Sequence, residues 1–174
     1  MTRKDFDPGP PLPITTDTSG PRPTLIFVRD LRHSREKVWE ALTDPKQLAE
    51  WAPFTPDHSL AAPGPATLSM TDEGKTEEFR AQVTEAVYPS RLEYLWGEDL
   101  LVWTLEPHGK GGTRLTLRHT VDSKDWIPKV AAGWHICLAV AERLLDGHPV
   151  GPITGSDARN YGWEELREAY SGER

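Results

Sequence analysis

The fold is decided by residues 91–145, which read RLEYLWGEDLLVWTLEPHGKGGTRLTLRHTVDSKDWIPKVAAGWHICLAVAERLL. Segments 91–97, 100–107 and 113–121 alternate apolar and polar residues and are separated by glycine-containing turns, which predicts antiparallel hairpins. The segment 126–145 that follows predicts a long amphipathic helix, because its apolar residues recur at spacings of three and four. Its predicted apolar stripe is Ile127, Ala131, Trp134, Leu138, Ala141 and Leu145.

Segments earlier in the chain extend the same predicted sheet. The runs 24–31, 66–70 and 76–87 are rich in β-branched and aromatic residues and predict further strands. Ser34 is a predicted N-cap for one short helix. The pair Asp44-Pro45 opens a second short helix that ends near Trp51. The predicted fold class is therefore α+β, with an antiparallel sheet, two short helices after the first strand and one long C-terminal helix.

The chain of 174 residues is long enough for one domain of ordinary size. Residues 1–23 contain 6 of the 16 prolines and little to bury, which predicts an extended or disordered arm. The domain itself is predicted to span 24–146. Residues 147–174 then form a loop and a short helix packed on the domain, with Trp163 and Leu166 on its apolar side.

Composition excludes several classes of function. The formal net charge of −7 opposes binding to nucleic acid or to an anionic membrane surface. The longest apolar run, 130–141, is too short to insert across a bilayer, and the first residues lack the apolar segment of a secretory signal. The single cysteine, Cys137, excludes an intramolecular disulfide and any cysteine-based zinc site. We therefore expect a cytoplasmic protein.

Three stretches resemble one known family. The first runs from Arg29-Asp30-Leu31 through Val38-Trp39-x-Ala41-Leu42-Thr43-Asp44-Pro45-x-x-Leu48-x-x-Trp51. The second comprises Pro89-x-x-Leu92-x-Tyr94-x-Trp96, Leu105-Glu106-Pro107 and Gly112-Thr113-Arg114-Leu115-Thr116-Leu117-x-His119. The third is Gly133-Trp134-His135. In this order they resemble the helix-grip (START-like, SRPBCC) superfamily, and within it the branch of activators of the 90-kDa heat-shock chaperone's ATPase.

This resemblance implies a curved antiparallel sheet wrapped around the C-terminal helix, with an apolar cavity between them. It covers residues 24–146. The eukaryotic chaperone activators carry a separate N-terminal domain, which 23 proline-rich residues cannot supply. The name of the branch therefore does not by itself assign an activity to this protein.

Aromatic residues are the candidates for the cavity wall. The chain has seven tryptophans, and an apolar ligand site needs aromatic walls with a few convergent polar groups. The alternative is that the same residues simply form the core. The predicted ligand-binding residues are Trp51, Phe54, Phe79, Tyr94, Trp96, Trp103, Leu117, His119, Trp134, His135 and Leu138.

Two histidines are candidates for polar chemistry in that cavity. His119 alternates with Leu115 and Leu117, so it points to the inner face, and His135 flanks the apolar stripe of the long helix. Each is either a hydrogen-bonded buried histidine, a polar contact for a ligand, or an acid–base group as in the cyclase and aromatase relatives of the superfamily. No histidine pair at i, i+4 lies on a predicted helix, so no metal site and no cofactor are expected.

The function expected from these observations is binding of a small hydrophobic or amphipathic molecule between the sheet and the long helix. The first alternative is a cyclase, aromatase or dehydratase that uses His119 and His135. The second is a co-chaperone or regulatory protein-interaction module, with a chaperone or another protein as its partner. The protein is expected to be a monomer or a homodimer.

Overall fold

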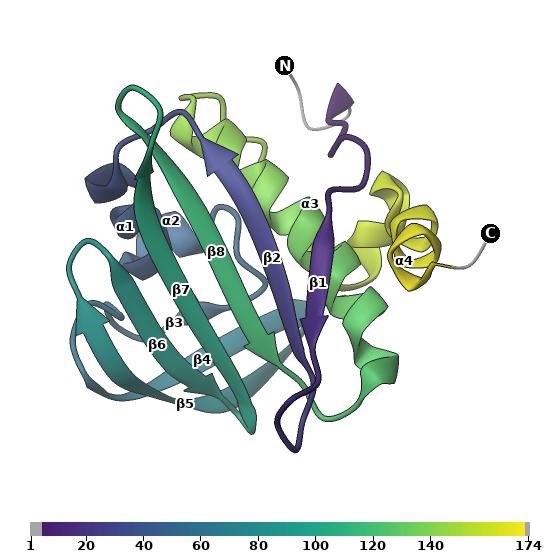
Figure 1. The fold of residues 1–174 in the computed structure, drawn as a ribbon, viewed down its shortest axis with the longest axis horizontal. Coiled ribbons are helices and arrows are strands. Elements are labelled where there is room, and N and C mark those ends of the chain that lie inside the picture. The colour runs from purple at the N-terminus through teal and green to yellow at the C-terminus, as the bar shows by residue number, and fades with distance from the viewer. Residues whose placement is uncertain (1–4, 173–174) are drawn as a thin grey trace.

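One antiparallel sheet of eight strands forms the body of the protein in a computed structural model that describes residues 5–172. The strand order is β1-β2-β8-β7-β6-β5-β4-β3. Strands β3 to β8 are therefore neighbours in chain order, and β2 pairs with the last strand, β8. Figure 1 shows the sheet curving around the long helix α3. The strands are β1 (Ile14–Asp17), β2 (Thr24–Leu31), β3 (Thr55–Pro56), β4 (Gly64–Asp72), β5 (Lys75–Val87), β6 (Arg91–Trp96), β7 (Asp99–His108) and β8 (Gly112–Thr120).

The helices lie close to where the sequence predicts them, although α2 ends at Leu48 rather than near Trp51. They are α1 (Arg35–Thr43), α2 (Pro45–Leu48), α3 (Ile127–Leu145) and α4 (Trp163–Ser171), with short 3₁₀ turns η2 (Lys124–Trp126) and η3 (Gly155–Tyr161). The Ser34 side chain accepts from the Lys37 amide and caps α1, and Asp44 caps α2 in the same way with Pro45 in the first turn. The predicted α+β class, with two short helices after β2 and a long C-terminal helix, is confirmed.

The inner face of the sheet is apolar because side chains alternate along each strand. On β8, Leu115, Leu117 and His119 are buried, while Arg114, whose side chain points to the opposite face, is exposed. The register places Leu117 opposite Phe27 of β2 and opposite Trp103 of β7. A shift of register between Val83 and Glu85 interrupts the β5–β6 pairing, and such bulges bend a strand. These inner side chains pack against α3.

The N-terminal segment requires a correction to the predicted arm. Residues 14–17 are extended, but they pair antiparallel with β2 and form the edge strand of the sheet. Phe6 is buried, and its ring centroid lies 6.0 Å from that of Tyr161. Within the described residues, therefore, this segment is part of the domain. The reason is that Ile14-Thr15-Thr16 is a short β-branched run between prolines, and β2 offers it an open edge.

The C-terminal segment lies against the same helix. α4 packs on α3 through buried Leu166, with Trp163 half-buried beside it. The hydroxyl of Tyr170 accepts a hydrogen bond from the Leu12 amide at 2.9 Å. No helix within residues 5–172 is long and apolar enough to cross a membrane.

Candidate functional site: an aromatic pocket beside His119

The space between the sheet and the middle of α3 is filled by aromatic rings. Trp103 stands edge-on to Trp51, with centroids 6.3 Å apart, and to Trp134 at 5.3 Å. Leu117 and Leu138 are buried in the same cluster. Edge-to-face packing at these distances is a favourable arrangement for aromatic side chains. Trp51, Trp103, Leu117 and Leu138, which were predicted to line a cavity, are buried in the core.

Each indole of this cluster has a hydrogen-bond partner. Trp51 Nε1 donates to the Ala41 carbonyl at 2.8 Å, and Trp103 Nε1 donates to the Tyr94 hydroxyl at 3.1 Å. Burial raises the pKa of the Tyr94 hydroxyl well above its usual range, so this group remains protonated. A core with satisfied indole N–H groups is rigid and specifically packed.

His119 joins this core to the start of β7. Trp134 Nε1 donates to His119 Nδ1 at 2.9 Å, and His119 Nε2 lies 2.8 Å from a carboxylate oxygen of Asp99. An indole N–H can only donate, so Nδ1 is the acceptor and Nε2 carries the proton that it donates to Asp99. The side chain of His119 is 1% exposed. Both ring nitrogens are therefore occupied.

Asp99 continues the chain of polar contacts outward. Its second carboxylate oxygen lies 3.3 Å from a guanidinium nitrogen of Arg22, in the segment between β1 and β2. The same guanidinium donates to the carbonyl oxygen of Glu98 at 2.7 Å. Arg22 thus connects the turn between β6 and β7 to the β1–β2 hairpin at one end of the sheet.

A pocket of about 490 Å³ opens beside His119 at this end of the molecule. We call it the aromatic pocket. It lies between β5, the β6–β7 turn, the end of β8 and the first turns leading into α3. Its lining is Phe79, Trp96, Gly97, Glu98, Asp99, His119, Val121, Asp122, Trp126 and Val130. Its volume is within the usual range for small-molecule sites, about 300–1,000 Å³.

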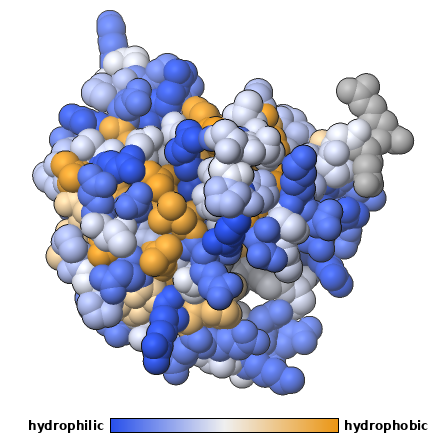
Figure 2. Space-filling model, turned by 60° about the horizontal axis from the view of Figure 1, so that its bottom comes forward, coloured by the Kyte–Doolittle hydropathy of each residue, from blue (hydrophilic) through white to orange (hydrophobic). Residues whose placement is uncertain are grey.

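The surface around this end of the molecule is mostly hydrophilic. Figure 2 is turned so that the end where β6 meets β7 comes forward, and apolar side chains form separate areas among hydrophilic ones. Trp126 is 48% exposed, which is unusual for so large an apolar side chain. Because it also lines the aromatic pocket, a bound molecule would cover apolar surface that is otherwise in water.

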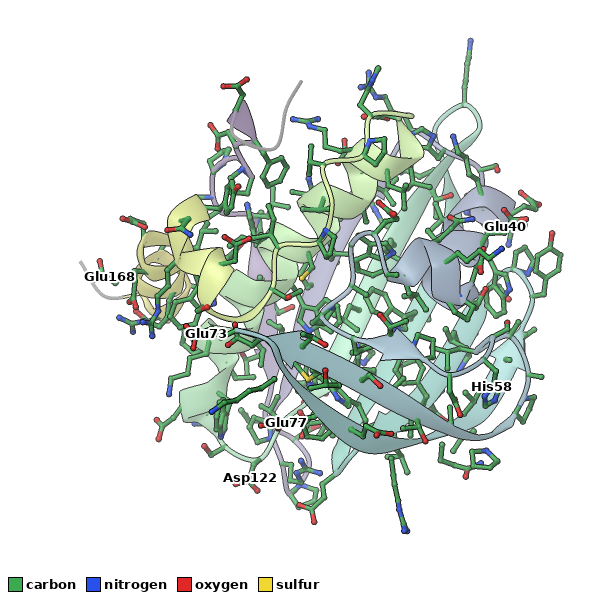
Figure 3. All side chains as sticks on the ribbon, turned by 180° about the vertical axis from the view of Figure 1, so that it is seen from behind. Glu40, His58, Glu73, Glu77, Asp122 and Glu168 are labelled. Atoms are coloured by element: carbon green, nitrogen blue, oxygen red, sulfur yellow. The ribbon has the colours of Figure 1, made fainter. Side chains whose placement is uncertain are left out.

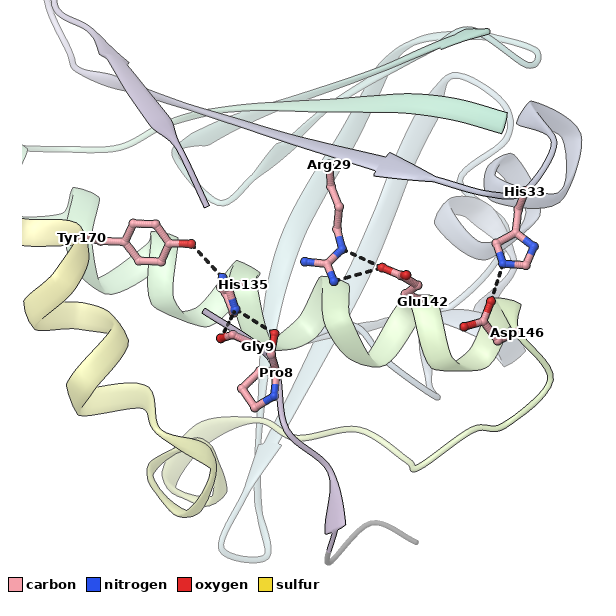
Figure 4. A network of polar contacts seen from close by, with 8 residues as sticks. All are labelled: Pro8, Gly9, Arg29, His33, His135, Glu142, Asp146 and Tyr170. Carbon is pink, nitrogen blue, oxygen red and sulfur yellow. Dashed lines mark hydrogen bonds and ion pairs between the residues drawn. The ribbon is translucent and has the colours of Figure 1, made fainter. Parts of the chain in front are cut away.

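His135 is not in this pocket, which corrects the prediction that it faces the cavity. Its Nε2 donates to the carbonyl oxygens of Pro8 at 2.9 Å and Gly9 at 3.1 Å. Its Nδ1 lies 2.7 Å from the Tyr170 hydroxyl and accepts from it. Figure 4 shows this network on the side of α3 that faces the N-terminal segment and α4. Burial lowers the pKa of His135. This histidine is an anchor for the N-terminal segment.

A second hollow, of about 650 Å³, lies between that segment, the edge of β2 and α3. Its lining is mainly the proline-rich stretch 8–15 together with β2, and it contains the Arg29–Glu142 ion pair at 3.0 Å. It has no aromatic wall, apart from the ring of His135.

The predicted site residues therefore divide into groups. Phe79, Trp96 and His119 line the aromatic pocket. Phe54, Tyr94 and Trp134 stand behind it, with Phe54 4.8 Å from the Trp96 ring centroid. Sequence reasoning missed Asp99, Trp126 and Val130, although Trp126 directly precedes the predicted stripe of α3 and was available as a signal.

Other reactive groups do not add chemistry to the pocket. Cys137 is buried, which raises the pKa of its thiol to about 12, so it is not a thiolate near neutral pH. Within residues 5–172, no group of three or more His, Cys, Asp or Glu side chains is placed to hold a metal ion.

An eight-stranded antiparallel sheet curved around a long C-terminal helix defines the helix-grip class. A family model described as Activator of Hsp90 ATPase homolog 1-like protein matches residues 32–146, so the chain belongs to that family. Comparison with curated proteins gives no match.

Solved structures of the same fold share little sequence with this chain. CalU16 from Micromonospora echinospora is 19% identical with a TM-score of 0.64, covering 91% of this chain and 92% of its own. A conserved protein of unknown function from Enterococcus faecalis is 15% identical with a TM-score of 0.67, covering 91% and 88%. DynU16, from the dynemicin biosynthetic locus, is 22% identical with a TM-score of 0.64, covering 76% and 51%. These similarities show the fold.

Proposed function

We propose that this protein binds a small molecule with an apolar body in the aromatic pocket. The observation that supports this proposal is the convergence of Phe79, Trp96 and Trp126 around one open hollow, with His119 and Asp99 fixed at its wall. Aromatic walls with a few oriented polar groups are what such a site requires. Belonging to a helix-grip family is consistent with ligand binding.

The hydrogen bonds favour binding over acid–base catalysis. A general base needs a nitrogen free to take a proton from the substrate. The two nitrogens of His119 are engaged with Trp134 and Asp99. Those of His135 are engaged with the N-terminal segment and Tyr170 on the other side of α3. The cyclase-type alternative, which used these two histidines, therefore receives no support from their geometry.

The experiment is a calorimetric titration with naphthylmethanol, a neutral molecule with an aromatic body. Covering about 100–200 Å² of apolar surface contributes roughly 2.5–5 kcal/mol, so we expect a Kd of the order of millimolar. The variant Val130→Trp places an indole in the aromatic pocket and should abolish binding. Absence of binding to the parent protein would overturn the proposal.

The matched control is Val28→Trp. Val28 is a valine on β2 that lines the second hollow beside the N-terminal segment, and its side chain is exposed. Because the two variants add the same volume, they locate the site. We expect Val28→Trp to bind naphthylmethanol like the parent. Loss of binding in Val28→Trp but not in Val130→Trp would place the site in the second hollow and contradict the proposal.

A further inference from the structure

The charged residues that line the aromatic pocket are all acidic. They are Glu98 and Asp99 from the β6–β7 turn and Asp122 from the segment that leads into α3, and no lysine or arginine is among the lining residues. Glu98 and Asp122 are exposed, so neither carboxylate is held in the core. Figure 3 shows Asp122 at the lower edge of the molecule, at the end where α3 begins. The rim of an apolar pocket thus carries negative charge.

Nearby cations neutralise this rim only in part. Arg22 pairs with one oxygen of Asp99, whose other oxygen accepts from His119. Lys129 lies over the Trp126 ring, with its ammonium nitrogen 4.9 Å from the ring centroid. Lys124 belongs to η2 and is exposed. None of these three lines the pocket, and Glu98 and Asp122 have no ion pair among the described residues 5–172.

The aromatic walls of the pocket also attract cations. The face of an indole carries negative potential and attracts a cation within about 6 Å of its centroid. Lys129 and Trp126 already form such a contact within the chain. The ring of His119 accepts a hydrogen bond from the Trp134 indole on Nδ1 and therefore presents no second N–H donor to an anion. The net charge of −7 acts in the same direction over longer distances.

From these observations we infer that the aromatic pocket selects organic cations, in which an apolar or aromatic body carries a protonated amine. The body lies against Trp96 and Trp126, and the ammonium group lies at the rim near Glu98 and Asp122. This inference rests on the proposed function, because it names the chemical class of the ligand for the same pocket. An anion of the same shape would instead meet the carboxylates of Glu98 and Asp122, which have no ion pair among the described residues.

The test compares three probes with one aromatic body, namely naphthylmethylamine, naphthylmethanol and naphthoate, by calorimetry at low salt. We expect the amine to bind most tightly and naphthoate least. Each exposed carboxylate contributes about a two- to fivefold preference for the amine over the alcohol. Raising the ionic strength from about 0.05 M to about 0.5 M should reduce this preference, since salt screens exposed charges.

Charge variants give changes of opposite sign in the ratio of amine to alcohol affinity. Asp122→Asn and Glu98→Gln should each lower the ratio about two- to fivefold, and Lys129→Met should raise it by a similar factor. Glu40→Gln, an exposed change on α1 away from the pocket, is the control and should leave the ratio unchanged. Urea unfolding checks that each variant is folded.

The outcomes separate this inference from the proposed function. Binding of naphthylmethanol without preference for the amine, or a ratio unaffected by Asp122→Asn and Glu98→Gln, would overturn the selection of cations and leave the binding site intact. Failure of all three probes to bind would overturn both. An equal fall of the ratio in Glu40→Gln would show that the preference comes from net charge alone, which also contradicts the inference.

Discussion

Trp134 of α3 and His119 of β8 are joined by a hydrogen bond from the indole N–H to Nδ1 at 2.9 Å, within the core. This bond joins the long helix to the sheet. The other ring nitrogen of His119, Nε2, donates to Asp99 at the pocket wall. It therefore fixes both the tautomer of His119 and the position of the helix beside the aromatic pocket. Loss of either partner leaves a buried polar group without its hydrogen bond.

The first prediction concerns this pair. His119→Phe keeps an aromatic ring in place but leaves the indole N–H of Trp134 unsatisfied, so it should lower the free energy of unfolding by about 1–3 kcal/mol. Trp134→Phe removes the donor and reduces the buried volume. In the double variant neither polar group remains, so its loss should be smaller than the sum of the single losses by about 1 kcal/mol. Urea unfolding measures all three variants, and strictly additive losses would show that the bond contributes nothing.

The second prediction concerns pH and His135. Burial lowers the pKa of this side chain, with a further contribution from the positive charge of Arg29, although hydrogen bonds to the Pro8 and Gly9 carbonyls and the charge of Asp7 act in the opposite direction. The unfolded chain therefore binds a proton at His135 at a higher pH than the folded chain does. Stability should fall as the pH decreases below about 6.5, the ordinary value for histidine, and level off below the folded pKa.

A protonated Nδ1 can no longer accept from the Tyr170 hydroxyl, so the contact between α3 and α4 must rearrange, while Nε2 still donates to the Pro8 and Gly9 carbonyls. Urea unfolding between pH 7.5 and 5 should show that the free energy of unfolding of the parent decreases as the pH falls. In His135→Gln this dependence on pH should be weaker. His58→Gln, which replaces an exposed histidine, is the control and should keep the parental slope. Asp30, whose pKa Arg114 lowers through a hydrogen bond, acts only below about pH 4. An unchanged slope in His135→Gln would refute this prediction.

The sequence predicted the sheet and helix well because period-two and period-3.6 patterns depend on local geometry alone. Alternation with Leu115 and Leu117 correctly placed His119 on the inner face. The same reasoning failed for His135, because its position at the flank of the helical stripe does not reveal which segment covers that flank. The partner is the proline-rich segment around Pro8, more than 120 residues away in the chain.

Whether the inner face encloses a cavity is a question of volume, which a residue pattern does not answer. Trp51 and Trp103 point inward as alternation and helical periodicity indicate, and their rings pack edge-on against each other. The aromatic pocket is at one end of the sheet, and Trp126, in the turn before α3, completes it. This position depends on tertiary packing of the turns, for which local sequence gives weak signals.

The third prediction concerns the contact between the β4–β5 hairpin and η3. The Asp72 carboxylate accepts hydrogen bonds from the amide and hydroxyl of Ser156, and a Cβ at Gly155 would collide with that carboxylate. Gly155 also has a φ of +59°. Gly155→Ala should therefore combine backbone strain with loss of these hydrogen bonds, at a cost of about 2–4 kcal/mol.

Gly147→Ala is the matched control, because Gly147 has a φ of +86° but nothing within 4 Å of an added Cβ. It should cost only the backbone strain, about 1–2 kcal/mol. Thermal or urea unfolding of the two variants isolates the contribution of the Asp72 contact. Equal losses in the two variants would mean that the contact adds no stability.

The last prediction distinguishes a filled core from an internal cavity at α3. Leu138 is 2% exposed and packs in the aromatic cluster, whereas Val130, one of the residues that line the aromatic pocket, is half-buried. Leu138→Trp should overpack the core and lower the free energy of unfolding by about 1–3 kcal/mol, while Val130→Trp has open space to occupy and should change it little. Urea unfolding measures the stability of both variants, and titration with naphthylmethanol measures whether each still binds the probe. A stable Leu138→Trp protein that no longer binds the probe would place the binding cavity in the interior, against the filled core described above.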